Sequence, residues 1–336
     1  MIPVAVLTGF LGSGKTTLLR RLLRHPDFAR TAVIINEFGE VGLDHDLVEA
    51  SEESLVELQT GCLCCAVRGD LALTLEDLLR RRDAGTVTPF ERVAIETSGL
   101  ADPAPILHTL MSDAGLARRL ALAGVVATVD AVNGLATLER YPQSVKQVAL
   151  ADRLILTKTD LAHGQYADLA ARLAALNPAA QREQASFGEV DPARLFDTGH
   201  PASLRARDLS AWLGLDAHNG AAAAGHHPGI SCFAILRNEP FKAVALTLLL
   251  EALAEHCGAD LLRLKGIVNI AENPDRPAVI HGVQHVFHPP VWLDRWPSRD
   301  RRSRLVCIGR DIQQAWIEAL IHAIEAEIAE VVAIGA

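Results

Sequence analysis

Residues 9–17 carry the clearest chemical pattern in the chain. They read Gly-Phe-Leu-Gly-Ser-Gly-Lys-Thr-Thr, the spacing of a phosphate-binding loop, in which a glycine and four further residues precede Gly-Lys-Ser/Thr. Glycines let backbone N–H groups surround phosphate oxygens, Lys15 reaches the terminal phosphates, and the Thr16 hydroxyl is a natural Mg²⁺ ligand. The residues that we assign to the nucleotide are Gly9, Gly12, Ser13, Gly14, Lys15, Thr16 and Thr17. The loop therefore predicts a bound nucleoside triphosphate with Mg²⁺.

Two apolar runs farther along the chain end in polar residues that suit the same ligand. The run 93–95 leads into Glu96, and the run 154–156 leads into Thr157-Lys158-Thr159-Asp160. Glu96 is expected to orient Mg²⁺ or the attacking water, although a carboxylate at a strand end can also cap the next turn. Asp160 can accept hydrogen bonds from both N1–H and the amine of guanine, a donor pair that adenine lacks. With Lys158 lying along the base, this segment predicts GTP rather than ATP.

A cluster of cysteines suggests a second ligand. Cys62, Cys64 and Cys65 lie almost side by side in the sequence, and soft ligands at this spacing favour Zn²⁺, Co²⁺ or Cu(I) over Mg²⁺. Such a local cluster needs further ligands or an exchange partner, and Glu37 and Glu40 are the candidate carboxylates. A redox pair and a set of small buried residues are the alternatives. We expect an open site from which the metal can be transferred.

Bulk properties narrow the class of protein. The chain has 336 residues, is 49% hydrophobic and carries a formal net charge of −9. The negative charge argues against a nucleic-acid partner, because a phosphate backbone requires clustered positive charge. No apolar run approaches the roughly 18 residues that span a bilayer. We therefore expect a cytoplasmic globular protein that binds neither nucleic acid nor membrane.

The order of elements predicts how these residues are positioned. Strand-like runs at 2–8, 32–36, 92–96, 123–129 and 152–156 are separated by helical patterns at 14–25, 71–82, 103–114 and 166–176. This alternation is typical of an α/β fold with a doubly wound, mostly parallel sheet, as in P-loop NTPases. The phosphate loop then lies where the first strand meets the first helix.

A second domain is expected after a linker. Residues 213–229 are mostly small and turn-forming, so we place a GTPase domain at 1–212 and a C-terminal α+β domain at 230–336. The expected elements of the C-terminal domain are strands at 230–236, 261–270, 278–287 and 304–309 and helices at 240–257 and 311–331. On the strand 278–287, a period of two puts His281 and His285 on one face and His288 on the other.

Together these segments resemble the CobW-type GTPases, a family related to the nickel-handling GTPases UreG and HypB. The matching segments occur in the family's order: the phosphate loop, then Asn-Glu-Phe-Gly-Glu at 36–40, Gly-Cys-Leu-Cys-Cys at 61–65, Glu-Thr-Ser-Gly at 96–99 and Thr-Lys-Thr-Asp at 157–160. The resemblance covers nearly the whole chain and implies that Glu37 lies near the metal. One departure is Thr157, where the family often has asparagine. Loss of the amide that braces this loop would relax the selectivity for guanine.

These observations predict a GTP-hydrolysing metallochaperone. Both Glu37 and the cysteines lie between the phosphate loop and Glu96, where GTPases keep segments that respond to the γ-phosphate. Hydrolysis would then alter the affinity for a divalent metal, zinc or cobalt, that is delivered to a client metalloprotein. The resemblance also allows a homodimer. The alternatives are a redox or regulatory GTPase switch and a P-loop small-molecule kinase. A small-molecule kinase, however, does not require residues that recognise guanine.

Overall fold

The computed structural model describes residues 1–36, 55–57, 66–185, 189–196 and 230–335. The predicted metal ligands, Glu37, Glu40, Cys62, Cys64 and Cys65, and the predicted linker 213–229 lie outside the described residues. The chain divides into two compact units, one formed by residues 1–174 and 180–200 and the other by residues 175–179 and 201–336.

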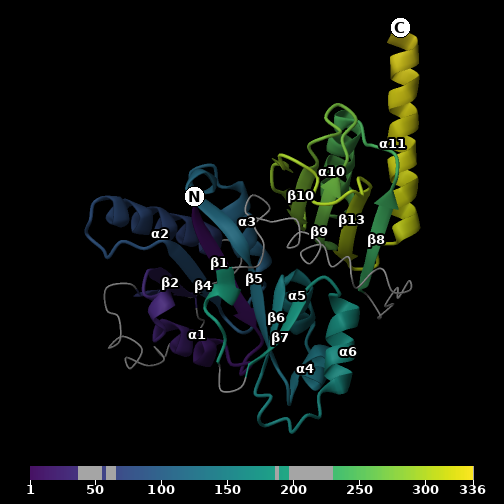
Figure 1. Cartoon of the computed structure of the whole chain (residues 1–336). Coiled ribbons are helices and arrows are strands. Elements are labelled where there is room, and N and C mark those ends of the chain that lie inside the picture. The colour runs from purple at the N-terminus through teal and green to yellow at the C-terminus, as the bar shows by residue number, and fades with distance from the viewer. Residues whose placement is uncertain (37–54, 58–65, 186–188, 197–229, 336) are drawn as a thin grey trace. The chain divides into compact units, whose positions relative to one another are not determined.

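The first unit is built on a parallel sheet. Its described strands are in the order β3-β2-β4-β1-β5-β6-β7, and every neighbouring pair is parallel (Figure 1). Their bounds are β1 (Ile2–Gly9), β2 (Thr31–Asn36), β3 (Leu55–Glu57), β4 (Arg92–Thr97), β5 (Leu120–Asp130), β6 (Arg153–Thr157) and β7 (Gln181–Ala185). Strands such as β1 are buried along nearly their whole length, as expected for a parallel sheet covered on both faces.

Helices connect these strands. They are α1 (Lys15–Leu23), α2 (Ala66–Asp83), α3 (Ala104–Ser112), α4 (Gly134–Arg140), α5 (Pro142–Leu150), α6 (Ala167–Leu176) and α7 (Ala193–Phe196). The connection from β1 to β2 runs in one direction along the sheet, and those from β4 to β5 and from β5 to β6 run in the other. Because such crossovers are right-handed, α1 covers one face and α3, α4 and α5 cover the opposite face.

One hydrophobic cluster holds α1 against its face of the sheet. Leu18, Leu19 and Leu22 are buried at helical spacing and pack with Leu7 of β1 and Leu195 of α7. On the same face, the rings of Phe28 and Phe196 lie 6.0 Å apart. This packing fixes the direction of α1, and therefore the position of the loop that precedes it.

The described residues of the second unit form an antiparallel sheet and two helices. The sheet order is β11-β10-β9-β13-β8, with β12 paired to β10. The bounds are β8 (Ser231–Arg237), β9 (Leu261–Val268), β10 (Ala278–Val283), β11 (Val286–Phe287), β12 (Val291–Trp292), β13 (Ser303–Gly309), α10 (Ala243–Cys257) and α11 (Gln314–Gly335). Leu249 and Leu253 of α10 and Ile317 and Ile321 of α11 pack against the sheet in one cluster, and α11 extends past the end of the sheet (Figure 1).

The predicted fold class is confirmed, with two local differences. The expected strand 278–287 is instead a hairpin, in which β10 turns at Gln284 (φ 54°) and pairs back through β11. His285 lies in this turn, and the His288 N–H donates to the His281 carbonyl (2.9 Å). The period-two relation predicted between His281 and His285 is therefore wrong, because a turn interrupts the strand.

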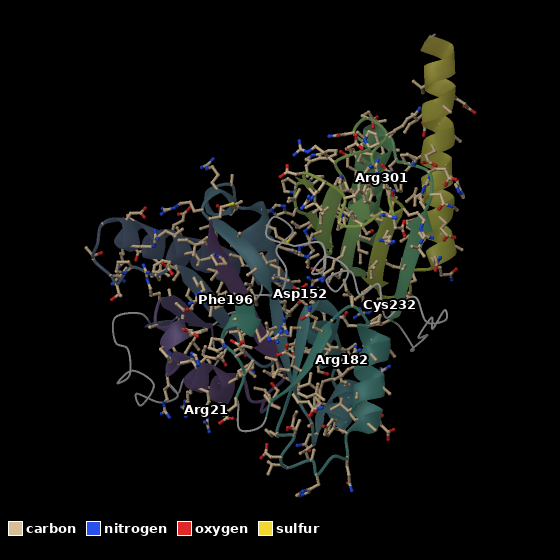
Figure 2. The ribbon with its side chains drawn as sticks, viewed as in Figure 1. Arg21, Asp152, Arg182, Phe196, Cys232 and Arg301 are labelled. Carbon is tan, nitrogen blue, oxygen red and sulfur yellow. The ribbon has the colours of Figure 1, made fainter. Side chains whose placement is uncertain are left out.

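Strand β7 is the second difference, since its sequence, Gln-Arg-Glu-Gln-Ala, has no apolar run to indicate a strand. Its alternate side chains, including Arg182 (labelled in Figure 2), are exposed. Glu183 forms an ion pair with Arg153 of β6, whose side chain is 1% exposed. A polar strand fits here because β7 is an edge of the described sheet, with one neighbouring strand.

Candidate functional site

The phosphate loop joins β1 to α1 at the carboxyl edge of the parallel sheet. Gly12 (φ 73°) and Gly14 (φ 93°) have left-handed backbone conformations, which glycine adopts without the steric cost of a Cβ atom. Gly14 is the N-cap of α1, so the first N–H groups of the helix point out of its N-terminus into the loop. A helix N-terminus preceded by such a loop is suited to bind the phosphates of a nucleotide.

Two polar side chains of α1 lie beside this loop. Lys15 is buried, and its Nζ donates hydrogen bonds to the carbonyl oxygens of Gly9 (2.9 Å) and Phe10 (3.3 Å). The Thr16 hydroxyl donates to Oε1 of Glu96 (3.0 Å), whose side chain is buried at the end of β4. A hydroxyl beside a carboxylate is a fitting pair of oxygen donors for Mg²⁺. The structure thus brings together Lys15, Thr16 and Glu96, which the sequence predicted for this site. Thr17, the next residue of α1, is exposed.

Hydrogen bonds from two other strands hold the loop in place. The Thr157 hydroxyl donates to the carbonyl of Ser13 (2.6 Å) and more weakly to that of Val129 (3.3 Å). The side chains of Ser13 and Thr128 are hydrogen-bonded at 2.6 Å. The Thr157 hydroxyl therefore braces the phosphate loop. Relaxed selectivity for guanine, expected because Thr157 lacks the amide of asparagine, stays a prediction. Thr128 was missed, since nothing in its local sequence distinguishes it from other strand residues.

Lys158 is held by a carboxylate that sequence reasoning also missed. Its Nζ lies 2.8 Å from Oδ2 of Asp130, at the end of β5, and its own backbone is left-handed (φ 57°). Burial raises the pKa of Asp130, but hydrogen bonds from Lys158, Asn133 and the backbone N–H groups of Val132 and Asn133 outweigh this effect and lower the pKa. Asp130 is therefore ionised at neutral pH. Its position at the end of an apolar strand, like that of Glu96, was the available signal.

The segment after Glu96 is held by helix α5. The buried side chain of Gln147 donates from Nε2 to the carbonyls of Gly99 and Ala101, each at 3.1 Å. Next to it on α5, Lys146 forms an ion pair with Asp102. These contacts connect the segment that follows β4 to α5, on the face of the sheet that α3, α4 and α5 cover.

Comparisons with known proteins agree with this geometry. The family model described as "CobW/HypB/UreG, nucleotide-binding domain" matches residues 3–184, and that described as "Cobalamin synthesis protein cobW C-terminal domain" matches residues 230–325. The chain belongs to the CobW/HypB/UreG family. This membership confirms the resemblance inferred from the motifs.

Relatives within the CobW family match along almost the whole chain. The zinc chaperone YjiA of Escherichia coli (strain K12) is 35% identical over 324 residues, which are 95% of this chain and 97% of that protein. The zinc chaperone CobW of Pseudomonas aeruginosa is 32% identical, over 94% of this chain and 89% of that one. The crystal structure of Zn(II)-bound YjiA GTPase from E. coli superposes with a TM-score of 0.72 at 30% identity, covering 96% of this chain and 98% of that chain.

The predicted metal ligands of this CobW-family chain are adjacent in sequence to described elements. Strand β2 ends at Asn36, which is in register with Thr97 of β4, and Glu37 is the next residue. Helix α2 begins at Ala66, directly after Cys65. Within the described part of the chain, no group of three or more His, Cys, Asp or Glu side chains is placed to hold a metal.

The other three cysteines behave as core residues, as their apolar surroundings predict. Cys232 on β8 (labelled in Figure 2) and Cys307 on β13 are buried, and Cys257 at the end of α10 is half-buried. Burial raises the pKa of the Cys232 thiol to about 12, and it also raises the pKa of Cys257 and Cys307. These raised pKa values disfavour the thiolate form, which is the form that binds metals and reacts. Among the described residues, no helix is long and apolar enough to cross a membrane.

Proposed function

We propose that this chain hydrolyses GTP and uses the hydrolysis to control the binding and delivery of zinc, with cobalt as the second candidate metal, to a client metalloprotein. Zinc is favoured because the two curated relatives described above are named zinc chaperones and YjiA was crystallised with Zn(II). The single observation that carries the nucleotide half of the proposal is the Thr16–Glu96 hydrogen bond at the base of a phosphate loop.

The roles of the nucleotide-site residues follow from their positions. Lys15 exchanges its bonds to the Gly9 and Phe10 carbonyls for phosphate oxygens, and so neutralises charge that builds up as the terminal phosphate leaves. Mg²⁺ bound with GTP would be held by Thr16 and would neutralise phosphate charge. Glu96 accepts the Thr16 hydroxyl bond and orients either the ion's water shell or the attacking water. Asp160 follows Thr157 by three residues and is half-buried. Its carboxylate accepts hydrogen bonds from N1–H and the amine of guanine.

The metal half of the proposal rests on adjacency along the chain. Glu37 follows the strand that lies beside Glu96, since Ile35 is in register with Glu96 and Asn36 with Thr97. Neighbouring strands are roughly 4.8 Å apart. A movement of Glu96 on hydrolysis would therefore occur one strand away from β2, the strand that precedes Glu37 and Glu40 in the sequence. We propose that these carboxylates and the thiols of Cys62, Cys64 and Cys65 hold the transferred metal.

Replacing both Cys64 and Cys65 by alanine tests the metal assignment. In the full-length protein kept anaerobic, we expect this double variant to lose tight zinc binding, measured by competition with a chromophoric chelator, while it still binds GTP. The matched control is Cys257→Ala, which removes a half-buried thiol and should leave zinc binding unchanged. Zinc binding of parental strength in the double variant would place the metal elsewhere. Failure of zinc to protect the three thiols from alkylation would favour the redox switch.

A further inference from the structure

An open pocket of about 450 Å³ lies on the second unit, where the connection from β12 to β13 meets the connection from β9 to β10. All the residues that line it come from these two connections, and five of them are charged: Asp275, Asp294, Arg295, Arg299 and Arg301. Its volume is within the range of ligand pockets, roughly 300–1,000 Å³. The pocket is therefore suited to a ligand that carries charge.

Hydrogen bonds hold the two connections together around the pocket. Trp296, in the wall, is 9% exposed, and its Nε1 donates to the Pro274 carbonyl (2.7 Å). The side chain of Asn269, at the end of β9, donates from Nδ2 to the Arg301 carbonyl (3.1 Å). A pocket that is held in this way loses little conformational entropy when it binds a ligand.

Both carboxylates in the wall are already paired. Asp275 accepts a hydrogen bond from Nη1 of Arg301 (2.9 Å), which is labelled in Figure 2. Asp294 accepts one from Nη2 of Arg276 (3.1 Å). Each acid is therefore balanced by one arginine, and neither neutralises the two remaining arginines of the wall.

Those two arginines can each bind an anion. Arg295 and Arg299 are exposed, and neither side chain makes a hydrogen bond or ion pair with a residue that the structure describes. Asp300, which is adjacent to Arg299 in the sequence, is bonded instead to Arg302 and Arg304. The hydrogen bond from Arg302 lowers the pKa of Asp300 to about 2, so this carboxylate is ionised and occupied at neutral pH.

Carboxylates of a protein segment fit this pattern better than a phosphate backbone does. A planar guanidinium binds a carboxylate through two parallel hydrogen bonds. Asp275, Asp294 and Asp300 lie among the arginines and would repel a row of closely spaced phosphates, which requires clustered positive charge. Because the whole chain has a formal net charge of −9, a local excess of arginine would also orient an acidic partner toward this pocket.

We propose that this pocket binds an acidic segment of a partner protein, with one carboxylate on Arg295 and another on Arg299. This interaction goes beyond the proposed control of zinc by GTP, and its residues belong to neither the nucleotide site nor the predicted metal site. Its test can therefore fail while the proposed function stands.

Two labelled peptides test the proposal with the full-length protein. One is a fluorescein-labelled decapeptide of alternating glutamate and glycine, and the other has glutamine in place of glutamate. We expect fluorescence anisotropy at low ionic strength to show about tenfold tighter binding of the glutamate peptide, the effect of two exposed ion pairs. Added salt should weaken this binding, because it screens exposed charges. Equal affinities for the two peptides would overturn the proposal.

Charge-matched variants test where the peptide binds. Arg295→Gln combined with Arg299→Gln should weaken binding of the glutamate peptide about tenfold. The control combines Lys242→Gln with Arg310→Gln, which removes two exposed cations of the same unit that do not line the pocket, and should leave the affinity unchanged. The same affinity in both double variants would overturn the proposal, because binding would not depend on the pocket.

A short fluorescein-labelled DNA duplex tests the alternative class of ligand. We expect the full-length protein to bind it more weakly than the glutamate peptide, because acids interrupt the positive charge of the wall. Tighter binding of the duplex than of the peptide, lost when Arg295 and Arg299 are replaced, would instead indicate a phosphate-binding surface and overturn the assignment to an acidic protein segment.

Discussion

The two described sheets differ in the kinds of side chain that they bury and in where those side chains lie. In the first unit, Lys15, Glu96, Asp130 and Thr157 are all buried where parallel strands end or where the loop after β1 enters α1. In the second unit, the sheet and helices α10 and α11 enclose an apolar cluster, and the buried cations Arg263 and Lys265 lie in the middle of β9.

This contrast indicates where the function lies. Buried polar groups destabilise a fold unless they are paired, and in the first unit they are concentrated at the edge where parallel α/β sheets bind ligands. Their hydrogen bonds link four strands through the phosphate loop. The first unit therefore holds a buried polar network at the edge of the sheet that carries the phosphate loop, while the described core of the second unit is mainly apolar.

The largest expected effect comes from Lys15→Ala in the first unit. Loss of the ammonium removes a preorganised positive charge at the transferring phosphate, so we expect kcat for GTP hydrolysis to fall about 10²–10³-fold. Steady-state phosphate release measures this effect. The control is Lys242→Ala, which removes the exposed lysine before α10 and should leave turnover at the parental rate. Equal turnover in Lys15→Ala would remove Lys15 from the mechanism.

Leu253→Ala probes the second unit in the same way. Leu253 is fully buried in the apolar cluster, and its truncation leaves a cavity that should destabilise this unit by about 2–5 kcal/mol. Hydrogen exchange of β9 and β13 measures the loss. Leu248→Ala, on the exposed side of the same helix, should change stability by less than about 0.5 kcal/mol. If Leu253→Ala instead abolished GTP turnover in protein that remains folded, the contrast between the units would fail.

Thr157→Val removes the hydroxyl that braces the phosphate loop while keeping the side-chain shape. The Ser13 carbonyl loses its 2.6 Å donor, so we expect a loss of about 1–2 kcal/mol in the stability of the first unit together with weaker nucleotide binding. Thermal unfolding and a GDP titration report the two effects. The matched control is Thr247→Val on α10, whose exposed hydroxyl bonds the Ala243 carbonyl. Identical behaviour of the two variants would contradict the bracing role.

Local motifs predicted the parts of the site that lie within one segment of chain. The phosphate loop, Glu96 and the 157–160 segment could be recognised because each consists of consecutive residues after an apolar strand. The mostly parallel sheet also followed from the alternation of elements, apart from short or polar strands such as β3 and β7, whose pairing depends on neighbours rather than on an apolar pattern.

The partners of these residues could not be predicted in the same way. Ser13 and Thr128 are 115 positions apart, and Lys158 and Asp130 are 28 apart. Which strand residues meet depends on the register between strands, and a shift of one residue would turn each side chain to the other face. Gln147 was missed for a similar reason, since its two bonds cross from α5 to a loop more than 40 residues earlier.

The coupling between nucleotide and metal is the central claim, and one titration tests it directly. The affinity of the full-length protein for a non-hydrolysable GTP analogue should be measured with and without saturating Zn²⁺, and the zinc affinity with and without the analogue. Linkage requires the two ratios to be equal, and we expect each to be about 5- to 150-fold. Nucleotide affinities that are identical with and without zinc would contradict the claim that GTP controls the metal.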